Sequence, residues 1–321
     1  MMAYYIHDLD PFILRVGETW GLRWYGMAYL LAFVVGFFIY RRLAQKGFSD
    51  LKPDQVGDFI FGGAVFGVVL GGRLGYMLFY HLDGFVADPL SFFHLSEGGM
   101  SAHGGIFGLA LYSLWFARRH RVSWLNLGDN LVVVAPLGLL FGRIANFING
   151  ELYGRVATVP WAVQFPLELY DRPEMAELAV REAMTINPAW TTVDQVVGAV
   201  AGSPELREQL AVTLSPRHPS QIYEAALEGL LLFFILWFMR TRLRLRNGVL
   251  TGVFFIGYAV LRSFCELFRE PDAPLTGVLT RGQFLSVFLV LVGIGFLVAS
   301  WKQRVVGPES GQETAQLPSD R

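Results

Sequence analysis

Long apolar runs separated by short polar connections form the main pattern of the sequence. A helix needs about 20 mostly apolar residues to cross the hydrocarbon core of a bilayer. Seven runs reach this length once glycine and isolated polar residues are tolerated, at residues 20–40, 56–80, 99–117, 127–149, 221–239, 249–268 and 283–301. The pattern therefore predicts an all-α integral membrane protein with about seven transmembrane helices.

Two of these runs, the third and the fourth, contain polar residues such as Ser101 and Asn146, which weakens the prediction there. The first run follows Asp8, Asp10 and Glu18 and has no basic segment before it, so it does not resemble a cleavable signal. We therefore expect it to remain in the protein as a permanent span.

Basic residues gather beside alternate connections, which indicates the orientation of the chain. The connections after the first, third and fifth runs contain Arg41, Arg42, Lys46, Lys52, Arg118, Arg119, Arg121, Arg240, Arg242, Arg244 and Arg246. In contrast, residues 81–98 contain no Lys or Arg, and residues 150–220 contain more acidic than basic residues. The connections rich in Lys and Arg are predicted to face the cytoplasm, with the N-terminus outside and the C-terminus inside.

The same pattern divides the chain into regions. Residues 1–306 are predicted to form the membrane-embedded domain, with residues 150–220 as a periplasmic subdomain between the fourth and fifth spans. Helix-like patches in this segment are broken by Pro173, Pro188 and Pro204. Residues 307–321 are polar and aperiodic, and they are predicted to form a disordered cytoplasmic tail.

Composition agrees with the membrane class and excludes several others. Hydrophobic residues make up 53% of the chain and charged residues 17%, which does not describe a soluble domain. The single cysteine, Cys265, excludes an internal disulfide and a thiolate metal cluster. Phosphate-loop, zinc and nucleic-acid motifs are not evident, so we expect no metal, no organic cofactor and no nucleic-acid partner. The basic connections are expected to face anionic membrane lipids.

Polar side chains within the predicted spans gather at one depth, near the outer ends. With the orientation above, this set consists of Tyr25, Arg73, Tyr76, His103, Arg143, Asn146, Asn149, Glu151, Gln221, Tyr223, Glu224, Tyr258, Arg262 and Glu266. An ionisable residue inside a span costs roughly 2.5 to 3.5 kcal/mol on insertion scales, so each one needs a partner or a function. The distribution predicts a polar chamber that opens toward the outer leaflet.

Helical spacing groups some of these residues. Tyr258, Arg262 and Glu266 are four residues apart and share a helix face, so Arg262 is expected to pair with Glu266. Arg143 and Asn146 also share a face. Two arginines in an outer chamber suggest an anionic ligand such as a lipid phosphate, because guanidinium forks match phosphate geometry.

Structural interpretations remain open beside these functional ones. The Arg262–Glu266 pair could be purely structural, but a structural role is disfavoured for Arg143 because its neighbours in sequence are amides. A histidine such as His103 is more often a packing residue, although Gly104 and Gly105 beside it would permit close approach of a ligand or a backbone. The aromatic side chain of Tyr25 could simply lie at the membrane interface, and Gly71, Gly72 and Gly75 are expected to serve helix packing.

The sequence around Arg143 resembles the signature of the prolipoprotein diacylglyceryl transferase family. The resemblance rests on residues 142–154 (GRIANFINGELYG), with companion motifs at 23–26 (RWYG), 99–105 (GMSAHGG), 217–224 (RHPSQIYE) and 268–272 (FREPD). It extends from about residue 10 to residue 305 in the expected order. Ala102 departs from the bulkier residue usual in the family, and the segment after Pro166 does not align.

The resemblance implies transfer of the diacylglyceryl group of phosphatidylglycerol to the lipobox cysteine of exported prolipoproteins, with release of glycerol phosphate, at the bacterial inner membrane. It implies a monomeric enzyme whose partners are phosphatidylglycerol, prolipoprotein signal peptides and the surrounding membrane lipids. The predicted catalytic residues are His103, Arg143 and Arg262, and the predicted substrate-binding residues are Tyr25, Asn146, Asn149, Glu151, Gly154, Tyr258 and Glu266.

The chemistry of this transfer suggests a role for each predicted catalytic residue. Arg143 and Arg262 would bind the phosphate and stabilise its growing negative charge, and His103 would remove the proton of the thiol. A hydrogen bond from His103 to the phosphate or to an ester carbonyl is the competing role.

Functions of two other classes fit the sequence less well. An anion transporter would also place paired arginines in a cavity, but it should carry broken helices at the membrane midplane and polar groups on both sides of it. The inner halves of the predicted spans are almost wholly apolar. A non-catalytic lipid-binding scaffold would need neither His103 nor two arginines at one depth.

Overall fold

A computed structural model describes residues 4–16, 21–94, 98–271 and 280–307 of the chain. The start of the first predicted span at residue 20, the last motif residue Asp272, and the predicted tail beyond Gly307 lie outside the described residues.

Helices occupy all seven apolar runs, which confirms the all-α class. They are α1 (Trp24–Gln45), α2 (Gln55–Gly62) continued by the π-helix η1 (Gly63–Val69) and α3 (Leu70–Phe79), α5 (Ala102–His120), α6 (Trp124–Asn149), α11 (Ser220–Glu224) continued by the π-helix η5 (Ala225–Leu231) and α12 (Leu232–Arg242), α13 (Val249–Cys265) and α14 (Arg281–Ser300).

Length and apolar composition suffice for membrane crossing in five described segments: Trp24–Gln45, Gln55–Tyr80, Trp124–Asn149, Ser220–Arg242 and Arg281–Ser300. The helix α13 is shorter, and α5 carries the polar residues noted above. The protein is therefore a multi-pass helical membrane protein, and the count of seven spans stays a prediction. Large apolar side chains such as Phe288 and Leu291 of α14 are exposed, as lipid-facing positions should be.

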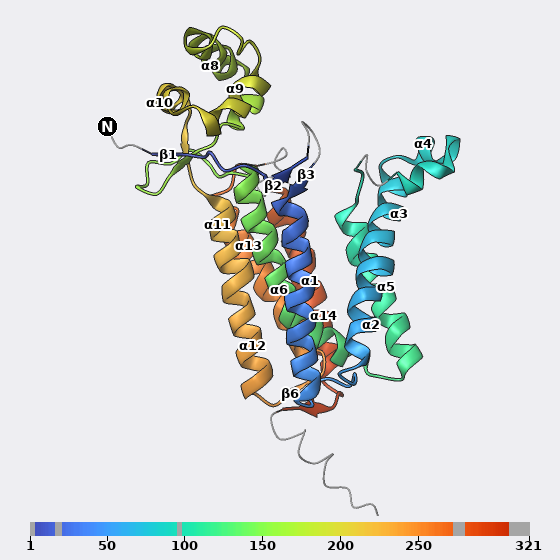
Figure 1. Cartoon of the computed structure of the whole chain (residues 1–321). Coiled ribbons are helices and arrows are strands. Elements are labelled where there is room, and N and C mark those ends of the chain that lie inside the picture. Colours follow the sequence, from blue (N-terminus) through green and yellow to red (C-terminus); the bar gives the residue numbers. More distant parts are fainter. Residues whose placement is uncertain (1–3, 17–20, 95–97, 272–279, 308–321) are drawn as a thin grey trace, which may run out of the picture. The chain divides into compact units, whose positions relative to one another are not determined.

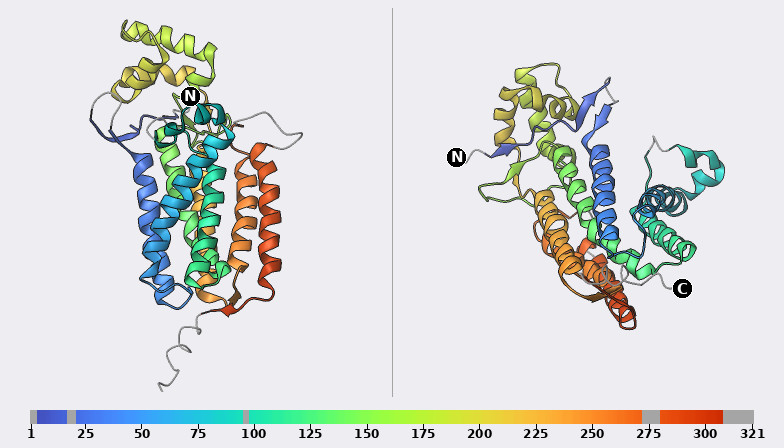
Figure 2. Two further views of the ribbon diagram at one scale, coloured as in Figure 1. Left: turned by 90° about the vertical axis from the view of Figure 1, so that its right-hand side faces the viewer. Right: turned by 60° about the horizontal axis from the view of Figure 1, so that its bottom comes forward.

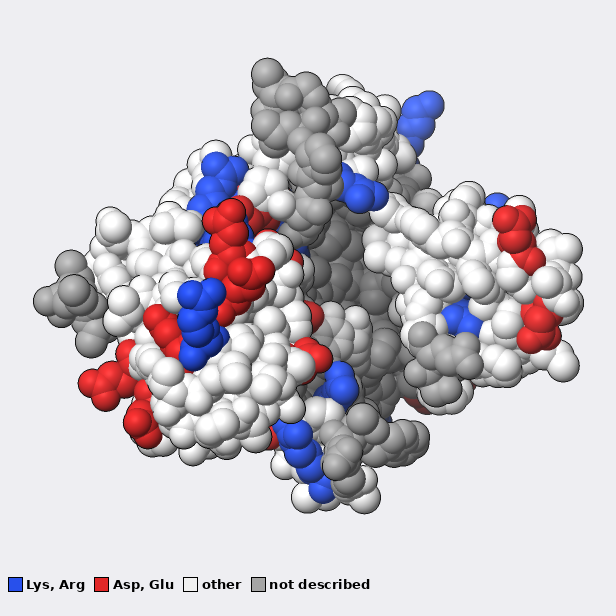
Figure 3. Space-filling view, turned by 90° about the horizontal axis from the view of Figure 1, so that it is seen from above, with Lys and Arg blue, Asp and Glu red and all other residues white. Residues whose placement is uncertain are grey.

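The chain divides into two compact units. Unit 1 contains Met1–Ala32, Pro136–Phe234 and Phe255–Val292, and unit 2 contains Phe33–Ala135, Ile235–Phe254 and Gly293–Arg321. Seen from above, both acidic and basic side chains lie on the surface, and uncharged atoms cover most of it (Figure 3).

Short helices and strands occupy residues 150–220 of unit 1. The helices are α7 (Glu168–Asp171), α8 (Pro173–Ile186), α9 (Val193–Ala199), the 3-10 turn η4 (Val200–Gly202) and α10 (Pro204–Thr213). Figure 1 shows α8, α9 and α10 gathered in one group. They bury alanine and leucine side chains such as Ala179, Ala183, Leu206 and Leu210 against one another. This group has a hydrophobic core of its own.

Sequence signals explain where these helices start. Pro173 and Pro204 occupy the first turn of α8 and α10, where the missing N–H of proline breaks no helical hydrogen bond. Thr192 and Gln195 form a reciprocal capping box at the start of α9. Two of the three prolines that interrupt the sequence pattern are thus helix starts, and the third, Pro188, lies in the turn after α8.

Strands in unit 1 are short. The order β1–β4–β5 forms one sheet, with β1 (Tyr5–Ile6) parallel to β4 (Val163–Gln164) and β4 antiparallel to β5 (Pro216–Arg217). The strand β2 (Phe12–Arg15) pairs antiparallel with β3 (Gly21–Arg23), which immediately precedes α1.

In unit 2, α3 and α5 lie side by side (Figure 2) because glycines line their contact. A Cβ atom at Gly71 would lie 2.6 Å from the carbonyl oxygen of Gly104, and one at Gly75 would lie 2.7 Å from the Gly104 Cα. These distances confirm that Gly71 and Gly75 serve packing, and they show that Gly104 meets a backbone.

Unit 2 also contains α4 (Leu82–Ala87), the 3-10 turn η2 (Pro89–Phe93), and a two-stranded pair of β6 (Leu245–Arg246) and β7 (Val305–Val306). The core of this unit includes Tyr40, Phe59, Phe116 and Leu127. Arg240 is buried here, and its Nε donates to Asn130 Oδ1 at 3.1 Å.

Candidate functional site

Charged side chains of three helical segments in unit 1 meet inside the protein. This Arg–Glu cluster consists of Arg143 from α6, Glu224 and Glu228 from α11 and η5, and Arg262, Glu266 and Arg269 from α13 and the turn that follows it. Glu224 and Glu228 are four residues apart, so both face the same neighbours. Arg262 and Glu266 have the same spacing.

Glu224 lies at the centre of the cluster and contacts all three arginines. Its Oε2 lies 3.0 Å from Arg143 Nε, and its Oε1 lies 3.1 Å from Arg269 Nη1 and also pairs with Arg262. The Glu224 side chain is fully buried. A buried carboxylate with three guanidinium partners fixes three parts of the chain at one point.

Glu228 is held less closely. Its Oε2 lies 3.5 Å from Arg143 Nη2, and its Oε1 lies 3.6 Å from Arg262 Nη1. Among the described residues, Oε1 has no hydrogen-bond partner, although the side chain is fully buried. Arg262 also pairs with Glu266 through its second terminal nitrogen, as the spacing predicts.

Charge in the cluster is balanced, because three arginines face three glutamates. The arginine side chains are still partly accessible, with exposed fractions of 16% for Arg143 and 12% for Arg262. An anion that reaches these guanidinium groups has to compete with carboxylates already bound to them.

A second polar group forms where α6 ends. Asn146 Nδ2 donates to Glu151 Oε1 at 2.7 Å, and Asn149 Nδ2 donates to the same oxygen at 3.3 Å. The backbone carbonyl of Glu151 accepts from Gln221 Nε2 at 2.6 Å. These bonds orient the Glu151 carboxylate and tie the end of α6 to the start of α11.

Gly154 lies at a crowded crossing of the chain. Its N–H donates to the carbonyl of His218 at 2.9 Å, and the next residue, Arg155, donates its N–H to the carbonyl of Phe268 at 2.8 Å. A Cβ atom at Gly154 would lie 2.5 Å from the carbonyl oxygens of both His218 and Phe268. Glycine is therefore required here by packing, and the predicted contact of Gly154 with substrate stays untested.

Arg217 forms a further ion pair network outside the spans. It is buried, it pairs with Glu168, and its Nη1 lies 3.2 Å from Glu270 Oε2 and 3.0 Å from the Gly154 carbonyl. Burial alone would lower the pKa of Arg217, but the neighbouring Glu168 and Glu270 carboxylates outweigh it and raise the pKa. Because Glu270 follows Arg269, this network adjoins the Arg–Glu cluster along the chain.

His218, the neighbour of Arg217, is partly buried. Its Nδ1 lies 3.1 Å from the Tyr223 hydroxyl oxygen, which accepts from Trp161 Nε1 at 2.7 Å. Burial lowers the pKa of His218, so the neutral imidazole is favoured.

The remaining predicted site residues lie as follows. Tyr258 precedes Arg262 by one turn of α13, within electrostatic range of Glu228 and Arg262. Tyr25 is half-buried at the start of α1, with its ring centroid 5.3 Å from that of Tyr29. His103 belongs to unit 2, where its side chain is exposed on the first turn of α5.

Arg73, expected in the polar chamber, has a structural role. Its three nitrogens donate to the backbone carbonyls of Ser91, Phe92, His94, Gly98 and Gly99. The guanidinium therefore holds the connection after α4 in place, and its donors are occupied there.

The neighbours of Arg143 in sequence are amides, but in the structure the carboxylates of Glu224 and Glu228 contact it from another helix. The expectation that Arg143 lacks carboxylate partners is therefore wrong. Sequence analysis also missed Glu228 and the role of Arg269. The four-residue spacing of Glu224 and Glu228, identical to that of Arg262 and Glu266, was the signal that could have found this pair.

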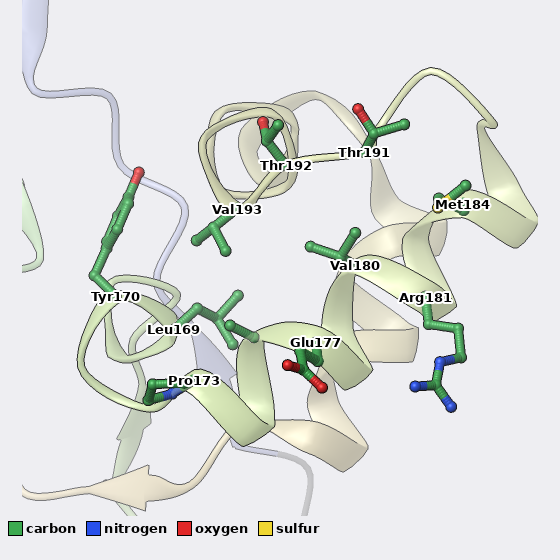
Figure 4. Close-up of a pocket in the computed structure, with 11 residues that line it drawn as sticks. Leu169, Tyr170, Pro173, Glu177, Val180, Arg181, Met184, Thr191, Thr192 and Val193 are labelled. Atoms are coloured by element: carbon green, nitrogen blue, oxygen red, sulfur yellow. The ribbon is translucent and has the colours of Figure 1, made fainter.

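A hollow of about 770 Å³ lies in the helical group formed by α7, α8 and α9. Leu169, Val180 and Val193 gather within it, whereas Arg181 extends away from them (Figure 4). None of the predicted site residues lines this hollow.

These features define a class: a multi-pass helical membrane protein that holds a buried Arg–Glu cluster between apolar helices. A sequence profile of the prolipoprotein diacylglyceryl transferase family matches residues 11–299. The chain therefore belongs to that family.

Individual relatives agree with the family match. A protein of Idiomarina loihiensis is 40% identical over 304 residues, covering 93% of this chain and 96% of the relative. One of Sinorhizobium medicae is 40% identical over 299 residues, which cover 89% of this chain and 90% of the relative. One of Bdellovibrio bacteriovorus is 36% identical over an alignment of 329 residues, which covers 91% of this chain and 93% of the relative. Each is named phosphatidylglycerol–prolipoprotein diacylglyceryl transferase.

Proposed function

We propose that this protein transfers the diacylglyceryl group of phosphatidylglycerol to the lipobox cysteine thiol of exported prolipoproteins. The reaction forms a thioether, releases glycerol phosphate and is the first step of bacterial lipoprotein maturation. Family membership supports the activity. The observation that supports it in the structure is the pair of partly accessible arginines, Arg143 and Arg262, inside the apolar helices α6 and α13.

The chemistry needs a site for the phosphate that leaves. The cysteine sulfur forms a bond to a glycerol carbon while the bond between that carbon and the phosphate oxygen breaks, and both electrons remain on the oxygen. Arg143 and Arg262 bind the phosphate and stabilise the negative charge that develops on it. Glu266 holds Arg262 in position.

Other residues shape the surroundings of the phosphate. Asn146 orients it, and Asn149 and Glu151 form the outer mouth of the site, which agrees with their hydrogen bonds to one another. Tyr25, Tyr258 and Gly154 complete the lipid site. His103 takes the proton of the thiol as general base, and its exposed position on α5 leaves it available for this task.

Family membership supports a location in the bacterial inner membrane and a monomeric enzyme. The charges of the connections support an N-terminus in the periplasm and a C-terminus in the cytoplasm. Residues 150–220 then form a periplasmic subdomain, where exported signal peptides with a lipobox cysteine arrive, and residues 307–321 form the cytoplasmic tail.

Product formation tests the function directly. Purified protein is mixed with phosphatidylglycerol and a lipobox peptide, and mass spectrometry is used to detect a peptide that carries diacylglycerol as a thioether. A peptide with serine in place of the cysteine is the control and should give no product. Absence of the thioether from the cysteine peptide would contradict the proposal.

A further inference from the structure

Glu228 differs from the other two glutamates of the Arg–Glu cluster. It lies in the π-helical segment η5, a conformation that is rare and frequent at functional sites. The next residue, Gly229, lets η5 approach α6 closely, because a Cβ atom there would lie 2.7 Å from Leu140 Cβ. This approach brings Glu228 beside Arg143.

The groups around Glu228 come from each neighbouring segment. Arg143 faces it from α6, and Arg262, Tyr258 and Cys265 face it from α13. Glu224 lies one turn earlier on its own helix.

Of the three carboxylates, Glu228 has the weakest contacts. Glu224 is held by three arginines and Glu266 by a direct bond to Arg262. The contacts of Glu228 are 3.5 and 3.6 Å long, and its Oε1 accepts no hydrogen bond from the described residues. If one carboxylate releases its arginine partners, Glu228 loses least.

An arriving phosphate changes the charge of the cluster. Three arginines and three glutamates sum to zero, so the single negative charge of a phosphodiester leaves an excess of one negative charge in a buried place. The excess charge favours the neutral form of a neighbouring carboxyl. A proton on the carboxylate that is easiest to release restores the balance.

We propose that Glu228 takes up one proton when the phosphate of an anionic phospholipid binds between Arg143 and Arg262. Proton uptake thus accompanies a headgroup with a net negative charge, because a headgroup with no net charge adds no negative charge for the proton to compensate. The proposal rests on the proposed function, since it uses the same phosphate site.

Calorimetry measures the proton directly. Short-chain dihexanoyl phosphatidylglycerol is titrated into the purified full-length protein without peptide, in two buffers at one pH that differ in their enthalpy of ionisation. A phosphodiester has no proton to exchange near neutral pH, so the difference between the two heats gives the number of protons taken up by the protein. We expect uptake of about one proton per bound lipid. The affinity for the lipid should fall up to tenfold for each pH unit above the pKa that the Glu228 carboxyl has in the lipid-free protein.

Further ligands and variants identify the group. Dihexanoylglycerol, which lacks phosphate, should bind without proton uptake, and glycerophosphoglycerol, a phosphodiester without acyl chains, tests whether the headgroup alone suffices. The variant Glu228→Gln keeps the size of the side chain and should bind phosphatidylglycerol with no proton uptake and no pH dependence. Glu208→Gln, the same change on an exposed position of α10, should behave like the parent.

Each outcome decides the proposal. Proton uptake by the parent that disappears in Glu228→Gln supports it, and binding to the parent without proton uptake overturns it, whether or not the variant folds. Uptake that persists in Glu228→Gln also overturns it. Failure of the proposed function would look different, since phosphatidylglycerol would bind with proton uptake and the lipobox peptide would remain unmodified.

Discussion

At the scale of single residues, the shape of the Arg143 guanidinium matters as much as its charge. Two of its nitrogens contact two different glutamates, and a lysine has only one charged nitrogen to offer. We expect Arg143→Lys to fold but to lose activity by roughly tenfold or more, because Lys cannot bind the phosphate with a planar fork. Initial rates of thioether formation measure this. Arg181→Lys, on the exposed side of α8, is the matched control, and a similar rate in both variants would contradict the prediction.

His103 is tested by its dependence on pH. A positioned general base contributes roughly 100- to 10,000-fold, so His103→Gln should lose rate by this order near pH 7. The loss should shrink as the pH approaches about 8.5, the ordinary pKa of a cysteine thiol, because the thiol then ionises without a base. Rates are measured from about pH 6.5 to about pH 9. A deficit that stays constant over this range would assign His103 to substrate binding.

Gly154 is required by its surroundings. Because a methyl group there would lie 2.5 Å from two carbonyl oxygens, Gly154→Ala should reduce stability by about 1–3 kcal/mol. Thermal unfolding in detergent measures the loss as a lower midpoint. Gly198→Ala in α9, where nothing lies within 4 Å of the added atom, should leave the midpoint unchanged or raise it. Equal midpoints for both variants would show that the crossing at Gly154 relaxes.

Sequence analysis identified the arginines but only one of their partners. The Arg262–Glu266 pair follows from a spacing within one helix, which periodicity predicts. Arg143 and Arg269 reach Glu224 from different segments, and sequence separation says nothing about such contacts. The same limit applies to Arg73. An arginine within an apolar run suggested a place in the polar chamber, but in the structure Arg73 binds backbone carbonyls.

At the scale of elements, the apolar runs predicted the long helices well because the bilayer fixes their length and composition. Their ends were less predictable. The helix α13 ends at Cys265, and not at residue 268, because the chain turns there with hydrogen bonds from Leu267 and Phe268. For α8 and α10 the sequence indicated only helix-like patches without bounds, since their short amphipathic patterns are weak and their prolines were read as interruptions.

A buried ion pair is expected to hold the helical group of α7 to α10 in place. Arg217 and Arg172 both contact Glu270, but Arg217 is 1% exposed and Arg172 is 51% exposed. We expect Arg217→Ala to cost about 3–5 kcal/mol, because it leaves Glu168 buried without its partner. Arg172→Ala should cost at most about 1 kcal/mol.

Hydrogen exchange of the amides in residues 168–213 separates these two variants. Exchange should be faster in Arg217→Ala than in the parent, whereas Arg172→Ala should match the parent. Equal protection in all three proteins would mean that the hydrophobic core of α8, α9 and α10 alone holds this segment.

At the scale of the whole molecule, orientation rests on the basic connections. Most of the arginines after the fifth run, such as Arg242 and Arg244, are exposed, as a cytoplasmic signal requires. Arg240 is buried and donates to Asn130 and to the backbone carbonyl of Phe48, so it has a structural role inside unit 2. The remaining basic residues still predict one orientation.

Thiol labelling in intact cells tests that orientation. Glu205→Cys in α10 and Lys46→Cys after α1 are each placed in a Cys265→Ala background, and both positions are exposed. An impermeant reagent should label the cysteine at position 205 in intact cells but the cysteine at position 46 only after permeabilisation, because residues 150–220 are predicted to lie outside and the basic connection inside. Labelling both cysteines after permeabilisation controls for reactivity. Equal labelling in intact cells would contradict the orientation, and the Arg–Glu cluster would then lack its proposed access to exported peptides.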